Sequence, residues 1–594
     1  MATRSLPPTS KKRKITSADD ALASIAQLEG QLASAISANA SLNPLVDLLD
    51  LAYASQDPPH MTKAIYALYR SFVLIIANGI FFGQTDAGNS KAVRSWLSER
   101  MNRYVELLSG LLKDNEPMLR TSALEILLSL QKHLSLALNK RDRGQAEGFD
   151  PQFHSNHFRK IVLALLTSPA SARSHSSSNK KAKTANISVE GNQIDPSVRD
   201  TFTKSYLNVY DDVRWFFLRD AANILAQDSS EPRSHVATNL LSILEGLSSF
   251  PSAESDLNSW WVEDLRTKPS RSTARANNGA EEDGEEVENG PEGEDDWRKF
   301  FEETPASQVD DKKKVPSARL HTLTIHESLH SLASHKAVFT HAWLSLLPRI
   351  SSGSAQSTRA NALRALNILH RGVLPHLTRP VLAMDWIGSC VDYGGTVGLL
   401  ALNALFTLMT QYNLDYPSFY TRLYAFLDRD VLHLKHRARF FRLTDLFLSS
   451  THLPAALVAS FVKRLSRLSL NAPPAAIIMI VPFVYNMLKQ HPALMPMIHR
   501  SDDVDAGGVD PFLPQETNPN LTRAVDSSLW ELYTHRQHYH ATVSTLTRVL
   551  EEAFTRPNYA MEDFLDHTYG TLYDTEARRK MRSAPAFVTD IPGQ

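Results

Sequence analysis

The sequence contains one short motif with the residue types of a zinc protease. HESLH at residues 326–330 matches the pattern H-E-x-x-H, in which two histidines on one helical face bind zinc and the glutamate is the general base. A catalytic zinc also needs a third protein ligand. Ala333 and Lys336 stand where the extended motif has Gly and His, and no later Glu occurs before Glu516. We therefore interpret the match as accidental and predict neither a metal site nor a catalytic site.

Two further short patterns also lack the residues that their chemistry needs. His433 and His436 have the spacing of two metal ligands, but the single cysteine, Cys390, cannot complete a Cys/His zinc site. The glycines of GGTVG at 394–398 are not followed by the Lys-Ser/Thr pair of a phosphate-binding loop. The sequence therefore predicts a protein that is not an enzyme and that has no cofactor.

The side chains that remain for function are cationic and lie in two neighbouring helical segments. On a helix, Lys435, Arg439 and Arg442 fall within about 60° of one another. In the next segment, three more cations cluster within one helical turn. Side by side, these stripes would contact phosphates or an acidic partner segment. An ordinary solvated helix face is the alternative. The candidate partner or RNA contacts are Lys435, Arg439, Arg442, Lys463, Arg464 and Arg467.

The net charge of −1 conceals a strong polarity along the chain. Residues 329–500 carry 17 Lys and Arg against six Asp and no Glu, so we expect a positive field over this region. Residues 281–296 carry ten acidic residues and no basic one. Near the start stand Lys11, Lys12, Arg13 and Lys14, a candidate nuclear-localisation signal whose alternative is an ordinary basic tail.

The bulk composition limits the compartment and the class of protein. A single cysteine excludes an internal disulfide framework and suits a reducing cytosolic or nuclear compartment. The beginning of the sequence has no apolar stretch of a secretory signal. The longest apolar runs are shorter than the roughly 18 residues that suggest a transmembrane helix. We therefore predict a protein of a reducing compartment, the cytosol or the nucleus, that has no membrane segment. Because no catalytic motif is complete, we also predict no small-molecule substrate.

Helical periodicity dominates the chain, and nothing in it resembles alternating strands. Between 123 and 138, for example, leucines recur at the spacing of one helical face. Units of about 15–25 residues occur in pairs, as in HEAT or armadillo repeats. We therefore predict an all-α, HEAT/armadillo-like α-solenoid with disordered inserts. Its expected parts are a disordered basic tail (1–18), N-terminal helical repeats (19–167), a disordered linker (168–197), a helical continuation (198–264), a disordered acidic insert (265–316), a basic helical-repeat core (317–500), a loop (501–520) and a C-terminal helical segment (521–594).

Long blocks of sequence in the basic core and beyond it are highly specific. They are YPSFYTRLYAFLDRDVLHLKHRARFFRLTDLFLSSTHLP and LVASFVKRLSRLSLNAPPAAIIMIVPFVYNMLKQHP within 414–500, and further along the chain SSLWELYTHRQHYH and MEDFLDHTYGTLYDTEARR. In these blocks the chain resembles the CCAAT-binding-factor domain family of nucleolar ribosome-assembly proteins. Together the blocks cover most of 320–580, whereas the N-terminal half is similar only around VRWFFLRDAA (213–222). One departure is Ala541, which stands where the family tends to place a proline.

The resemblance implies a non-enzymatic, helical-repeat subunit of the small-subunit processome, within the 90S pre-ribosome of the nucleolus. Its implied role is pre-18S rRNA processing and 40S ribosomal subunit biogenesis. The implied partners are nucleolar protein 14, as a stable heterodimer, and other small-subunit processome proteins, with pre-rRNA touching the basic faces. Two alternatives stay open: a nuclear helical-repeat module that acts in transport or transcription, and a zinc enzyme that would contain stoichiometric metal.

Overall fold

The computed structural model is built of helices throughout the part of the chain that it describes. The described residues are 11–38, 40–82, 88–143, 150–171, 173, 192–227, 234–269, 324–417, 419–433, 437–499 and 510–579, and none of them lies in a strand. The prediction of an all-α fold is confirmed. The chain divides into two compact units, Met1–Ala383 and Met384–Gln594.

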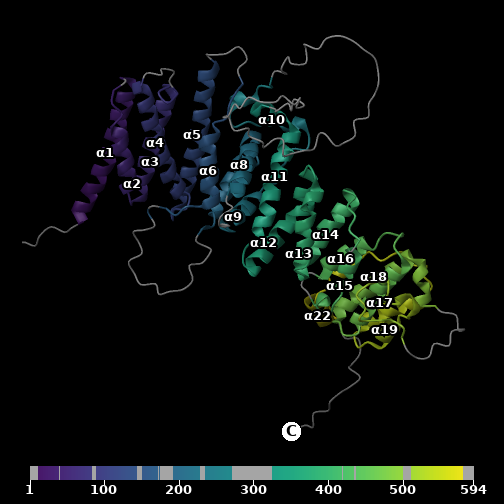
Figure 1. Ribbon diagram of the computed structural model, residues 1–594. Helices are drawn as coiled ribbons and strands as arrows, with labels where there is room; N and C mark the ends of the chain where they lie inside the picture. Colours follow the sequence, from purple (N-terminus) through teal and green to yellow (C-terminus); the bar gives the residue numbers. More distant parts are fainter. Residues whose placement is uncertain are drawn as a thin grey trace, which may run out of the picture. The chain divides into compact units, whose positions relative to one another are not determined.

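The N-terminal unit is a row of helices in which each packs on its neighbours along the chain (Figure 1). Helix α3 packs on α1, α2 and α5; α6 packs on α8 and α9; and α8 packs on α11. This neighbour-to-neighbour packing is the arrangement of an α-solenoid. The helices are α1 (Lys11–Ser37), α2 (Pro44–Ala54), α3 (Pro58–Ala77), α4 (Gly88–Leu111), α5 (Pro117–Arg143), α6 (Ser155–Thr167), α7 (Pro196–Phe202), α8 (Asp211–Gln227), α9 (Ser234–Leu244), α10 (Ile325–His330), α11 (Leu332–Ile350) and α12 (Ala355–Ile368).

Local sequence explains where these helices form. Helices α2, α3 and α7 begin with a proline in the first turn, where its missing N–H costs nothing. The leucine repeat of α5 places its side chains on the faces that meet α3, α4 and α6. Each of these leucines is at most 1% exposed, as the spacing predicted: Leu124, Leu127, Leu128, Leu130 and Leu134.

One helix of the C-terminal unit is buried over nearly its whole length. Every residue of α18 (Pro474–Gln490) from Ala475 to Leu488 is buried, so this helix is apolar on all sides and is covered by α17, α20 and α21. The other helices are α13 (Met384–Val391), α14 (Gly395–Gln411), α15 (Phe419–Ala425), α16 (Arg437–Phe447), α17 (Ala455–Ser469), α19 (Trp530–Thr534), α20 (Ala541–Thr547), α21 (Glu562–Leu565) and α22 (Tyr569–Arg578).

The glycines of the GGTVG segment serve packing at the start of α14. Gly394 and Gly395 have φ values of +65° and +53°, a backbone conformation that glycine adopts without strain. A Cβ atom on Gly398 would stand 2.4 Å from Cζ of Phe426 and 2.8 Å from the carbonyl oxygen of Val391. This glycine therefore permits the chain to approach α14 closely.

The structure differs from the predicted boundaries at several points. Helix α1 begins at Lys11, inside the segment expected to be a tail, and the side chains of Lys11, Lys12, Arg13 and Lys14 lie outside what the structure describes. The first of the two basic segments, which we expected to be one helix over 431–450, is divided, because a short 3-10 turn (Asp430–Leu432) precedes α16. The acidic run at 281–296 falls outside the described residues. Among the helices that are described, none is long and apolar enough to cross a membrane.

Candidate partner-binding surface

The HESLH motif is part of the internal packing of the N-terminal unit. His326 is 3% exposed, and its Nδ1 lies 2.9 Å from Oδ1 of Asp150. His330 donates from Nε2 to the carbonyl oxygen of Leu265 at 2.9 Å. Glu327 forms a capping box with Thr324 at the start of α10. Within the described parts of the chain, no group of three or more His, Cys, Asp or Glu could hold a metal ion.

The basic edge of α16 faces the C-terminal segment of its own unit. Arg442 forms two hydrogen bonds to the carboxylate of Glu562 on α21. Arg437, which is 8% exposed, donates from Nη2 to the carbonyl oxygen of His567 at 2.6 Å and lies over the ring of Tyr569. Arg439 is half-buried, and Lys435 lies outside the described residues. Helix α16 thus fastens residues 562–569 to the unit.

The structure corrects the prediction that Lys463 on α17 faces a partner. Its side chain is fully buried, and its Nζ lies 2.7 Å from Oε1 of Glu531 and 2.9 Å from Oδ2 of Asp510. It also donates to the carbonyl oxygen of Ser528 at 2.6 Å. A buried ammonium needs such partners because transfer out of water is costly. Lys463 therefore anchors the 510–531 segment to α17.

The two other cations of α17 are half-buried and also have internal partners. Arg464 donates from Nε to the carbonyl oxygen of Leu427 at 2.7 Å, and its guanidinium lies 4.5 Å from the ring centroid of Tyr424. Arg467 lies 3.9 Å from Asp510, which it shares with Lys463. The α17 cluster and the α16 cluster therefore bind different carboxylates, and the contacts described do not join them in one ridge.

Burial and hydrogen bonding set the protonation of the carboxylates around Lys463. Burial raises the pKa of Glu531, although the hydrogen bond from Lys463 opposes that change. Burial would raise the pKa of Asp510 as well, but hydrogen bonds from Ser527, Lys463 and Trp530 hold it well below its usual range. Asp510 is thus ionised at neutral pH and supplies a fixed negative charge beside the ammonium.

Sequence reasoning missed the carboxylates that neutralise the basic region. Residues 510–579 carry 11 Asp and Glu against six Arg and no Lys, which is the opposite bias to that of 329–500. Asp510, Glu531 and Glu562 come from this segment. This acidic bias in the sequence indicates that 510–579 attracts the basic residues. The expected positive field is therefore partly neutralised within the C-terminal unit.

Aromatic side chains are exposed on the same C-terminal segment. Trp530, Tyr533 and Tyr539 are 43%, 65% and 83% exposed. Trp530 and Tyr533 belong to α19 and flank a pocket of about 210 Å³. Exposed Trp, Tyr and Arg side chains are typical of protein-protein interfaces.

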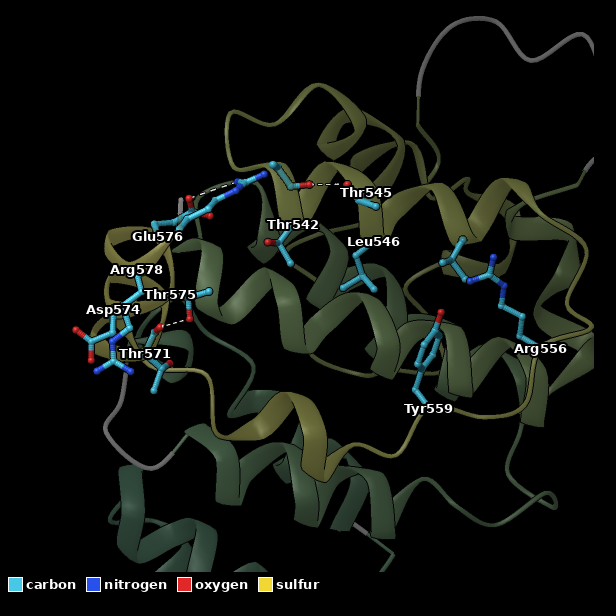
Figure 2. A pocket seen from close by; sticks show the side chains of 13 residues that line it. Thr542, Thr545, Leu546, Arg556, Tyr559, Thr571, Asp574, Thr575, Glu576 and Arg578 are labelled. Carbon is cyan, nitrogen blue, oxygen red and sulfur yellow. Dashed lines mark hydrogen bonds and ion pairs between the residues drawn. The ribbon is translucent and has the colours of Figure 1, made fainter. Parts of the chain in front are cut away.

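A wider groove of about 1,090 Å³ lies between α20 and α22 (Figure 2). Polar side chains of α22 line the groove, among them Thr571, Asp574 and Thr575, and Thr575 points toward α20 (Figure 2). The hydroxyl of Thr575 donates to the carbonyl oxygen of Thr571, and that of Thr545 donates to the carbonyl oxygen of Ala541. The described residues that line it also include the charged side chains of Arg556, Glu576 and Arg578, so the wall of the groove is largely polar.

The fold and these surfaces define an all-α helical-repeat protein whose charged residues largely hold its own segments together. Residues 15–230 match the family described as "Nucleolar complex protein 4-like, TPR repeats", and residues 398–547 match the CBF/Mak21 family. The chain belongs to the nucleolar complex protein 4 family. The resemblance seen in the basic core is confirmed, as is the α-solenoid, whose repeats this family describes as TPR repeats.

Similar proteins occur in fungi and vertebrates. An uncharacterised protein of Schizosaccharomyces pombe is 33% identical over 552 residues, covering 91% of this chain and 92% of that protein. Nucleolar complex protein 4 of Saccharomyces cerevisiae is 40% identical over 281 residues, which are 44% of this chain and 50% of that protein. A Homo sapiens homologue of nucleolar complex protein 4 is 43% identical over 265 residues, or 44% and 49% of the two chains. The match thus spans about half the length of the relatives that bear this name.

Proposed function

We propose that this protein is a non-enzymatic scaffold of the small-subunit processome that supports pre-18S rRNA processing and 40S ribosomal subunit biogenesis in the nucleolus. The observation that carries the proposal is membership of the nucleolar complex protein 4 family, with matched regions in both units. The described fold is consistent with a scaffold, because its motif histidines and buried charges serve packing.

Depletion of the protein tests this role in cells. We expect pre-18S rRNA precursors to accumulate and 40S subunits to fall relative to 60S subunits, with both restored by re-expression of the wild-type chain. Normal pre-18S processing after complete depletion would contradict the proposal. A loss of transcription or import of reporter cargo without an rRNA defect would favour the alternative role as a nuclear binding module.

Nucleolar protein 14 is the proposed heterodimer partner, and other processome proteins are proposed to bind the assembled pair. Support for a protein partner comes from the exposed aromatic side chains of the C-terminal unit, Trp530 and Tyr533 among them. The basic run at 11–14 is proposed to be the nuclear-localisation signal. Replacing all four of its side chains with alanine is expected to leave a fluorescent fusion in the cytoplasm.

Contact with pre-rRNA is proposed for the outer basic side chains of α16 and α17. Arg442 and Arg467 are 52% and 38% exposed, so each retains donors that a phosphate can reach beside its internal carboxylate. Reversing the charge of Lys435, Arg439 and Arg442 together is expected to weaken association with pre-ribosomal particles. Unchanged association in a folded triple variant would rule this contact out.

A further inference from the structure

A small pocket in the C-terminal unit has an apolar floor and an aromatic rim. Met497, Leu529 and Leu532 are at most 7% exposed and line it from within. Trp530 and Tyr533 stand beside it and are exposed. Its volume of about 210 Å³ lies below the 300 Å³ or more that is usual for small-molecule sites. The space therefore suits one large apolar side chain of another polypeptide.

Contacts within the unit fix the rim of this pocket in the unbound protein. Trp530 donates from its indole N–H to Oδ2 of Asp510 at 3.0 Å, and its ring covers the Nζ of Lys463 at 5.5 Å. Asp510 and Lys463 are also members of the ion cluster that joins this segment to α17. A wall fixed in this way loses little conformational entropy when a ligand binds.

Arg536 supplies a polar group at the edge of the pocket. Its Nη1 lies 2.9 Å from Oε1 of Glu551 and 3.5 Å from the hydroxyl of Tyr533. A guanidinium has five N–H donors. Among the described residues, the oxygens of Glu551 and Tyr533 approach Nη1, and the guanidinium also lies 5.8 Å from the ring centroid of Tyr533. The donors on Nε and Nη2 remain for an acceptor outside this chain. A neutral backbone carbonyl fits them best, because Glu551 already places a negative charge at this rim.

We propose that this pocket docks a protein segment that inserts one bulky apolar side chain and sets a backbone carbonyl beside Arg536. The combination of Trp, Tyr and Arg around a desolvated floor is that of an interface hot spot. Glu551, whose side chain is 41% exposed, stands at the same rim and repels phosphate, which favours a polypeptide over RNA. The inference rests on the proposed scaffold function and specifies one of its binding sites.

The test measures the affinity of the full-length chain for purified nucleolar protein 14. Tyr533→Ala removes an exposed wall of the pocket, and Arg536→Ala removes its free donors. We expect each variant to bind at least tenfold more weakly than the wild type, in the range of hot-spot truncations. Tyr573→Ala is the matched control, because Tyr573 is 74% exposed on α22 and does not line this pocket. It is expected to bind like the wild type.

The outcomes test the pocket assignment separately from the proposed heterodimer. If the wild type binds and both pocket variants bind equally well, the pocket assignment is overturned and the heterodimer stands. If the wild type does not bind, the heterodimer is overturned and the pocket assignment with it. If Tyr533→Ala weakens binding of a 20-nucleotide polyuridine probe but not of the protein, the site belongs to RNA and the proposal is overturned. Thermal unfolding of each variant checks that it is folded.

Discussion

Arg442 on α16 and Glu562 on α21 are joined by two parallel hydrogen bonds, with Nε–Oε1 at 2.7 Å and Nη2–Oε2 at 2.6 Å. The hydrogen bond to Glu562 raises the pKa of Arg442, and the bond from Arg442 lowers the pKa of Glu562. Both groups are therefore fully charged at neutral pH. The pair ties the C-terminal segment to a helix whose basic residues had suggested a surface for RNA.

Reversing one charge of this pair is expected to loosen the C-terminal segment. In Arg442→Glu, two carboxylates replace the fork-to-fork pair and repel one another. Backbone amides between Glu562 and Arg578 should exchange with deuterium several times faster, as measured by hydrogen-exchange mass spectrometry. The double variant Arg442→Glu/Glu562→Arg restores the attraction and should return exchange toward the wild-type rate. Equal exchange in all three proteins would show that the pair does not hold the segment.

The buried ammonium of Lys463 is expected to matter more than any surface charge. Lys463→Met leaves the fully buried carboxylate of Glu531 without its partner, and losing one member of a buried pair costs about 3–5 kcal/mol. Native-state hydrogen exchange of α17 and α19 in increasing urea should report this loss. Adding Glu531→Gln to Lys463→Met should recover part of it.

Arg548→Met is the control for this prediction. Arg548 is exposed, and a surface substitution of this kind changes stability by about 0.5 kcal/mol or less. If Lys463→Met costs no more than this control, the buried cluster does not anchor the segment.

Acid is expected to destabilise the N-terminal unit through its buried histidines. Burial lowers the pKa of His157 and of His335 to about 4, from about 6.5 in an unfolded chain. Above pH 6.5 both imidazoles are neutral in the folded and unfolded chains, and the free energy of unfolding has its full value. It falls as the pH drops toward 4, because only the unfolded chain takes up protons in this range. Burial raises the pKa of Asp212 to about 6, so this group alone makes the unit more stable as the pH falls from 6 toward 4.

Each of these groups changes the free energy of unfolding by up to about 1.4 kcal/mol per pH unit. Between pH 6 and 4 the destabilising effect of two histidines therefore exceeds the stabilising effect of one carboxylate. Urea midpoints of α6 and α11, followed by hydrogen exchange between pH 7 and 4.5, should therefore fall on acidification. In His157→Gln/His335→Gln the fall should be much smaller. An unchanged pH profile in this variant would mean that other groups determine it.

Gly398→Ala is expected to destabilise the C-terminal unit by about 1–3 kcal/mol, because the new methyl group overlaps the ring of Phe426 and the carbonyl of Val391. Gly388→Ala is the matched control, since a Cβ at Gly388 of α13 meets no atom within 4 Å. It should be neutral, or stabilising by up to about 1 kcal/mol. Chemical unfolding of both variants makes the comparison, and equal stability would contradict the packing role of Gly398.

The helices and the core could be predicted because they depend on local periodicity. The spacing of the leucines in α5 and the long apolar run of α18 are enough to predict that these side chains are buried. The family resemblance could likewise be recognised from contiguous blocks of sequence. These features need no knowledge of which distant segments meet.

The state of the basic residues could not be predicted, because it depends on partners far away in the chain. Lys463 and Glu531 are 68 positions apart, and Arg442 and Glu562 are 120 positions apart. Helical spacing assigns a face to each cation but does not say what covers that face. Only the acidic bias of residues 510–579 indicated that a counter-charge was present.

Affinity purification of the tagged full-length protein from nuclear extract, at low and at high salt, tests the scaffold function most directly. We predict one stoichiometric protein partner that stays bound at high salt, together with small-subunit precursor RNA that is lost first as salt rises. Recovery of promoter DNA or import cargo, with neither a stoichiometric processome protein nor precursor RNA, would contradict the account.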